Sequence, residues 1–117
     1  MDKSTAMNLL KNTYVPYTLI DGNEVQLTLA FYLLKLLEGK KPDLADRYYK
    51  LSSKKEMRDL DMVTILYTAY CCANLDKEDM LDEETFMILL GCDRLSMRSL
   101  MNQLMGAKKK PGSVTHS

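Results

Sequence analysis

The side chains that could hold a metal ion or act as a nucleophile are few. The only histidine is His116, close to the C-terminus, and no other titratable group is placed to orient it as a general base. The cysteines are Cys71, Cys72 and Cys92, two of them adjacent. A zinc site needs Cys-x-x-Cys spacing or a nearby histidine, and an odd number of cysteines does not suit a disulfide framework. We therefore predict buried free thiols in a reducing compartment.

An acidic stretch at 76–84 could suggest calcium, but its spacing does not suit the ion. An EF-hand loop needs a glycine at its sixth position, and this stretch contains none. We interpret it as a solvated linker whose last carboxylates begin a helix. The five glycines are scattered, so no phosphate-binding loop is predicted either. The sequence therefore predicts no cofactor, no metal site and no enzyme activity.

The composition suits one globular domain that binds other proteins. The chain has 117 residues, 46% of them hydrophobic, with 16 basic and 16 acidic side chains. A net charge of zero provides no general attraction to nucleic acid or anionic lipid, and it makes self-association easier. No signal peptide is expected at 1–11, and no run is long enough to span a membrane. These features predict a cytoplasmic protein.

A short β-hairpin is predicted at 17–27. Asp21-Gly22 separates two β-friendly runs, 17–20 and 23–27. A type I′ turn needs positive φ at both central residues, and Asp-Gly is a favoured pair for it.

The rest of the domain should be helical. Thr28 and Asp82 can cap two of the helices, and Gly39, Gly91 and Gly106 can end three of them. Apolar periodicity predicts helices at 29–38, 42–51, 57–74, 83–90 and 95–105. The predicted fold is mainly α: a compact bundle of about five helices with a small N-terminal hairpin, forming a single domain over 1–107, followed by a flexible tail at 108–117.

Apolar side chains exceed what a small core needs. The helices at 29–38 and 57–74 are apolar on nearly every side, and methionines line one stripe of 95–105. Methionine adapts to varied apolar partners, so this stripe suits a binding groove as well as it suits core packing. The residues that we expect to bind a partner are Phe31, Leu34, Tyr67, Tyr70, Met97, Leu100, Met101 and Leu104.

A helix-turn-helix is an alternative for the C-terminal part. The segment 85–91 ends in glycine and precedes the helix at 95–105, which offers Arg98, Asn102 and Gln103 to bases. A DNA-binding regulator is thus a second hypothesis. The neutral charge and the apolar character of the helix make nucleic acid the less favoured partner.

Three segments together resemble the tail assembly chaperones of long-tailed phages that infect Gram-positive bacteria. They are 27–36, 59–70 and 83–90, and the run Asp-Met-Val-Thr-Ile-Leu-Tyr-Thr-Ala-Tyr within 59–70 carries most of the likeness, which covers 17–105. The resemblance implies a protein that binds the hydrophobic, helical tape measure protein and keeps it soluble before the tail tube polymerises. It also implies homo-oligomers of helical or ring-like form, no cofactor, and a place in the cytoplasm of the infected host but not in the mature virion.

Two further expectations concern charge and length. The acidic stretch 76–84 and a basic set of Arg94, Arg98 and 108–110 favour head-to-tail contacts between copies, in which buried Met and Leu side chains would supply most of the affinity. Leu100→Asp or Leu104→Asp should therefore weaken association more than Arg98→Ala does. The lysine run at 108–110 would also suit ribosomal frameshifting to a longer form, although it suits a solubilising tail equally well.

Overall fold

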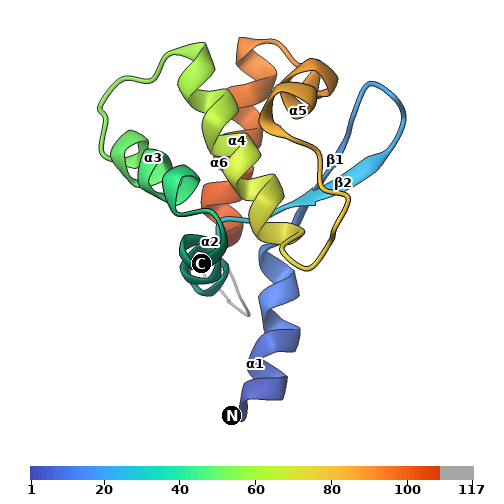
Figure 1. Cartoon of the computed structure of the whole chain (residues 1–117), viewed down its shortest axis with the longest axis vertical. Helices are drawn as coiled ribbons and strands as arrows, with labels where there is room; N and C mark the ends of the chain where they lie inside the picture. Colours follow the sequence, from blue (N-terminus) through green and yellow to red (C-terminus); the bar gives the residue numbers. More distant parts are fainter. Residues whose placement is uncertain (109–117) are drawn as a thin grey trace, which may run out of the picture.

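Helix α4 (Asp59–Ala73) runs through the centre of the molecule. The computed structural model describes residues 1–108, and within them every side chain from Asp61 to Cys72 is buried. Helices α2, α3, α5 and α6 and strand β2 all pack on α4 (Figure 1). A helix that is apolar all round can stay in water only if neighbours cover every side. The predicted mainly helical fold with a small hairpin is confirmed, and its buried apolar side chains form one cluster.

The other elements surround this helix. In chain order they are α1 (Lys3–Leu10), the short 3₁₀ helix η1 (Lys11–Thr13), β1 (Val15–Thr18), β2 (Glu24–Leu27), α2 (Phe31–Lys40), α3 (Pro42–Ser52), α5 (Glu83–Leu90) and α6 (Arg94–Lys108). None of the helices in residues 1–108 is both long enough and apolar enough to cross a membrane. The predicted tail lies outside the described residues, apart from Lys108, which ends α6.

Helices α3 and α5 begin where their end signals predict. Pro42 occupies the first turn of α3, where its missing N–H costs nothing. The Asp82 carboxylate caps α5 by accepting the Thr85 N–H at 2.8 Å. Gly91 ends α5 with φ +63°, a left-handed conformation that glycine adopts without strain.

Helices α2 and α6 differ most from their predicted bounds, while α4 begins at Asp59 where 57 was predicted and ends at Ala73 where 74 was predicted. Thr28 does not cap α2, because its buried hydroxyl bonds to the Thr13 hydroxyl at 2.7 Å and its N–H donates to the Ala69 carbonyl. Helix α2 therefore begins at Phe31, and it continues through Gly39 to Lys40. Helix α6 likewise continues through Gly106. At least one further helical residue follows each of these glycines, so neither glycine ends its helix.

The hairpin has a different turn from the predicted one. Val15 pairs with Leu27 and Thr18 with Glu24 in the antiparallel ladder. The Leu19 N–H donates to the Asn23 carbonyl at 2.8 Å, and the Gly22 N–H donates to the Leu19 carbonyl at 2.9 Å. This pattern belongs to a three-residue loop with glycine in its last position, not to a two-residue type I′ turn. The longer loop keeps Leu19 in the core.

Helix α1 was not among the helices predicted from the sequence, the first of which was placed at 29–38. The Asp2 carboxylate caps it by accepting the Thr5 N–H at 2.8 Å. No side chain of α1 is buried, and the helix extends from the body at the lower end of the molecule (Figure 1). Two turns without a buried stripe give little periodicity for a sequence to reveal.

Asp61 gives the fold an acid-sensitive anchor at the start of α4. Its carboxylate accepts from Lys54 Nζ at 2.7 Å and from the Arg58 N–H at 3.0 Å. These bonds, chiefly the one from Lys54, lower the pKa of the Asp61 carboxyl to about 2. Since an unfolded aspartate titrates near pH ~3.9, the carboxylate stabilises the fold fully above about pH 4 and loses this contribution as the pH falls towards 2.

Asp61→Asn is therefore expected to lower the free energy of unfolding at neutral pH. The gap between wild type and variant in this free energy should close in acid. Urea unfolding at a series of pH values between about 7 and 2 measures that gap. Lys54→Met, which removes the largest cause of the shift, should show a smaller gap with the same acid dependence. A gap that stays constant with pH would contradict this role for Asp61.

Candidate protein-binding surfaces

The residues predicted to bind a partner fall into two groups. Phe31 is exposed, with 77% of its surface accessible. Met101 is half-buried against the core. The other six are buried in the core: Leu34, Tyr67, Tyr70, Met97, Leu100 and Leu104. Partner binding by these six stays a prediction and would require the domain to open, whereas Phe31 is accessible in the folded state.

Tyr67 and Tyr70 organise the interior of the domain. Their rings pack on Phe86 of α5, with centroid distances of 5.5 and 5.1 Å. The Tyr67 hydroxyl donates to the Leu81 carbonyl at 2.9 Å, and the Leu81 N–H donates to the Tyr70 hydroxyl at 2.8 Å. Burial raises the pKa of both phenols, so both stay neutral. The two tyrosines thus fix the loop between α4 and α5.

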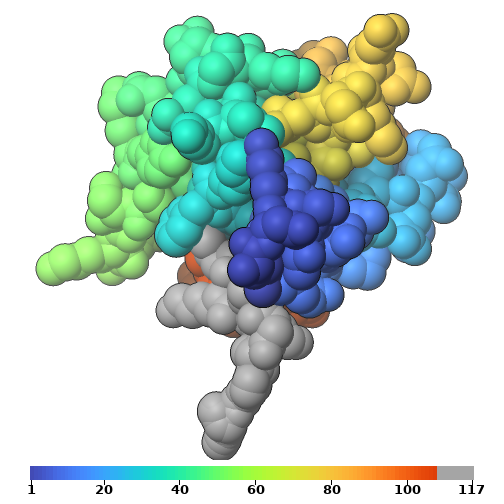
Figure 2. All heavy atoms as spheres, turned by 90° about the horizontal axis from the view of Figure 1, so that it is seen from below, coloured from blue at the N-terminus to red at the C-terminus, as the bar shows by residue number. Residues whose placement is uncertain are grey.

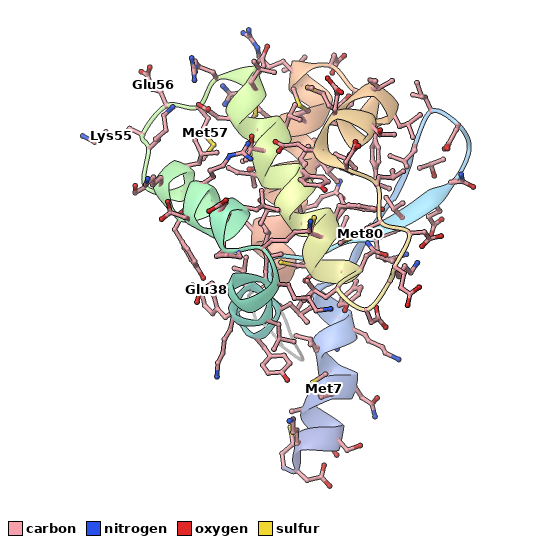
Figure 3. All side chains as sticks on the ribbon, in the orientation of Figure 1. Met7, Glu38, Lys55, Glu56, Met57 and Met80 are labelled. Carbon is pink, nitrogen blue, oxygen red and sulfur yellow. The ribbon has the colours of Figure 1, made fainter. Side chains whose placement is uncertain are left out.

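The methionine stripe of α6 faces the core. Met97 is buried among the side chains around α4, and only Met101 and Met105 of the stripe reach its edge. Met101 lines an open groove of about 520 Å³, together with Lys55, Glu56, Met57, Met62, Arg98 and Asn102. In Figure 3 Met57 turns inward from the loop between α3 and α4, while Lys55 and Glu56 point outward. Two of the three proposed base-reading residues, Arg98 and Asn102, therefore line a groove that also holds methionines.

One exposed apolar surface lies on helix α2. Phe31, Tyr32, Lys35 and Leu36 occupy neighbouring positions on the side of this helix that faces away from α4. Leu33, Leu34 and Leu37 fill the opposite, buried side. We name the first set the α2 face. Seen from below, the side chains of α2 lie on the surface next to those of α1 (Figure 2).

A second exposed apolar surface lies on α5. Glu84, Met87 and Ile88 share the exposed side of this helix, and we name them the α5 face. Ile88 has 65% of its surface accessible. The hairpin tip lies alongside, because the Ile20 N–H donates to the Leu89 carbonyl at 2.9 Å. A methyl at Gly91 would lie 2.1 Å from Ile20 Cγ2, so glycine also permits this close approach.

Polar contacts hold α5 in place. The Arg47 guanidinium of α3 binds both oxygens of Glu83 at 2.9 and 2.8 Å and donates to the Thr64 hydroxyl at 3.2 Å. This arginine lowers the pKa of the Glu83 carboxyl. Bidentate contacts between arginine and a carboxylate fix orientation well. They join α3, α4 and α5, so the α5 face is presented by a rigid support.

Helix α1 offers a third accessible surface. Met7 is 40% exposed and Met1 is 89% exposed. Figure 3 shows Met7 on α1, outside the packed body of the domain. Leu10, at the end of α1, packs against the core cluster and anchors the helix.

The groups able to do chemistry are dispersed. Cys71 and Cys72 are buried, as predicted, and burial raises the pKa of the Cys71 thiol. Within residues 1–108 no three histidine, cysteine, aspartate or glutamate side chains gather where they could hold a metal ion.

Sequence reasoning missed Tyr32, Leu36, Met87 and Ile88 as surface residues. Their signal is positional: each lies on the side of its helix opposite the leucines or the phenylalanine that pack on α4. That side can be identified only once it is known which stripe of α2 and of α5 faces α4.

No protein-family model, no curated protein and no solved structure matches this chain.

Proposed function

We propose that this chain is a tail assembly chaperone that binds the hydrophobic, helical tape measure protein of a long-tailed phage and keeps it soluble before the tail tube polymerises. The resemblance of 27–36, 59–70 and 83–90 to that family supports the proposal. The structural observation that carries it is helix α1 at the lower end of the molecule (Figures 1 and 2). None of its side chains is buried, and Met1 and Met7 are exposed there.

Helix α1 is suited to lie beside an apolar helix of the client. It has no buried side chain, so a client helix would displace none of the core. Its eight residues span about 12 Å, enough for two turns of a client. Met7 and Met1 can adapt to different client side chains because the methionine side chain is unbranched and polarizable. Weak contacts of this kind become effective when many copies hold one long client.

The proposal includes the setting of that task. The chaperone would act in the cytoplasm of the infected bacterial host and would be absent from the mature virion. It would need no cofactor, because covering apolar surface is a binding reaction.

Co-expression with a helical fragment of the tape measure protein tests the proposal. We expect a soluble complex, and the fragment should be short enough to hold one copy of the chain. Met7→Glu is expected to weaken binding roughly tenfold, the effect of losing about 1.4 kcal/mol of apolar burial. Met87→Glu is the matched control, because Met87 is also 40% exposed but lies on α5. Calorimetry or anisotropy with the labelled fragment measures both affinities.

The result that would overturn the proposal is an insoluble fragment with no binding at micromolar concentrations. A gel shift with duplex DNA then tests the alternative regulator. Binding that falls steeply with salt would favour that alternative, because counterion release dominates association with DNA.

A further inference from the structure

The two exposed apolar faces lie on helices that are apart in the molecule. In Figure 1, whose longest axis is vertical, α5 lies near the top, whereas α2 lies near mid-height and α1 forms the lower end. The domain measures 40 × 36 × 31 Å along its principal axes. One copy therefore cannot bring its own two faces together, and each copy presents both to its surroundings.

The faces match in length and spacing. On α2, Phe31 and Lys35 are one turn apart, and Tyr32 and Leu36 repeat the same interval. On α5, Glu84 and Ile88 are one turn apart, with Met87 beside Ile88. Residues four apart lie on the same side of a helix, about 6 Å from one another along the axis. Each face thus combines apolar groups with one charge a turn away, and on α2 the exposed Glu38 follows three residues after Lys35.

The charges of the two faces are opposite. Lys35 is the exposed cation of the α2 face, and Glu84 is the exposed anion of the α5 face. The carboxylate next to Glu84, that of Glu83, is already paired with Arg47. Arg94, which the sequence had suggested for contacts between copies, pairs with Asp59 of the same chain at 2.9 Å. Lys35 and Glu84 are therefore better placed than Arg94 to join two copies.

We propose that the α2 face of one copy binds the α5 face of a second copy, with the two helices antiparallel. This orientation sets Phe31 beside Ile88 and Lys35 beside Glu84. Tyr32, Leu36 and Met87 complete the apolar contact. The occupant is a second copy because the two faces carry opposite charges and belong to a chain of zero net charge, which has no general self-repulsion.

The contact uses two different surfaces, so it is heterologous. Each bound pair leaves one α2 face and one α5 face open, and further copies add until the rotation closes a ring or continues as a helix. The inference deepens the proposed function, since such an array would place successive α1 helices along one client. The contact between copies can be disproved while the proposed function holds, because a monomer could still bind a short client fragment.

Two variants, each with one face disabled, test the contact. Phe31→Glu places a carboxylate on the α2 face, and Ile88→Glu places one on the α5 face. Wild type should show an average mass that rises with concentration in sedimentation experiments from micromolar to near-millimolar protein. Each variant alone should remain monomeric. A mixture of the two should form a dimer and nothing larger, because each variant retains the face that the other lacks and two mutated faces repel each other.

Leu60→Glu is the matched control for Ile88→Glu. Leu60 is also 65% exposed, but it lies on α4 beside a groove between α3 and α4. This variant should associate as wild type does, and circular dichroism should show all three variants folded. Lys35→Glu should weaken association at least severalfold, and the double variant Lys35→Glu/Glu84→Lys should restore it, because the pair is then reversed.

Several results would overturn the inference: a monomeric wild type at every concentration, a mixture that stays monomeric, or a Phe31→Glu or Ile88→Glu variant that associates normally. A mixture that forms oligomers larger than a dimer would overturn it too. Binding of the short client fragment by monomeric Ile88→Glu would leave the proposed function intact while the contact between copies is judged separately.

Discussion

Leu104→Asp is expected to leave no folded domain at neutral pH. Leu104 is fully buried, packed with the core around α4. A carboxylate in that position loses its water without gaining a cation, which costs several kcal/mol even after relaxation. The apolar contacts of the leucine are lost as well. Since the whole stability of a small domain is about 5–15 kcal/mol, the two losses together should unfold it.

Circular dichroism and urea unfolding measure this effect, with Gln103→Asp, at an exposed position of the same helix, as the control. The control should stay folded and within about 0.5 kcal/mol of wild type. Leu100→Asp should behave like Leu104→Asp, because Leu100 is only 6% exposed. Reduced self-association of either aspartate variant would thus report unfolding. A folded Leu104→Asp with native stability would show that α6 does not pack as described.

Phe86→Ala is expected to cost about 3–5 kcal/mol of unfolding free energy, the range for removing a buried ring. Phe86 has no exposed surface and packs on both Tyr67 and Tyr70. Its loss leaves a cavity between α4 and α5. The same two tyrosines bind Leu81 through their hydroxyls, so the loop that leads into α5 should loosen as well.

Urea unfolding gives the free energy, and hydrogen exchange of the Leu81 amide reports on the loop. Met87→Ala is the neighbouring control and should cost less than about 1 kcal/mol, because Met87 is on the exposed side of α5. Equal losses for the two variants would contradict the assignment of Phe86 to the core and Met87 to the surface.

Local signals in the sequence predict the helices whose ends depend on local chemistry. Asp82 and Gly91 define α5 because a carboxylate cap and a left-handed glycine act within a few residues. Gly39 and Gly106 carry the same signal but are helical, since α2 continues to Lys40 and α6 to Lys108. Thr28 fails as a cap for a related reason: its partners, Thr13 and Ala69, are distant in sequence.

The surfaces were harder to predict than the fold. An apolar pattern shows which side chains leave water, but it does not show whether the same chain or another protein covers them. Leu34 and Phe31 belong to one helix and one apolar run, yet Leu34 faces α4 and is buried while Phe31 is exposed. The distinction depends on how α2 is rotated against α4, and that rotation is set by tertiary contacts.

The central position of α4 has a consequence for synthesis on the ribosome. The hairpin and α2 emerge first, but both pack against α4, and the Thr28 N–H donates to the Ala69 carbonyl near the end of that helix. Until residues 59–73 have been translated, the inward leucines of α2 lack the cover that α4 provides and can meet other nascent chains. Translation of α4 is thus the step at which the N-terminal half becomes protected. A pause before this segment would prolong exposure of the first half, whereas a pause after it would delay only α5 and α6.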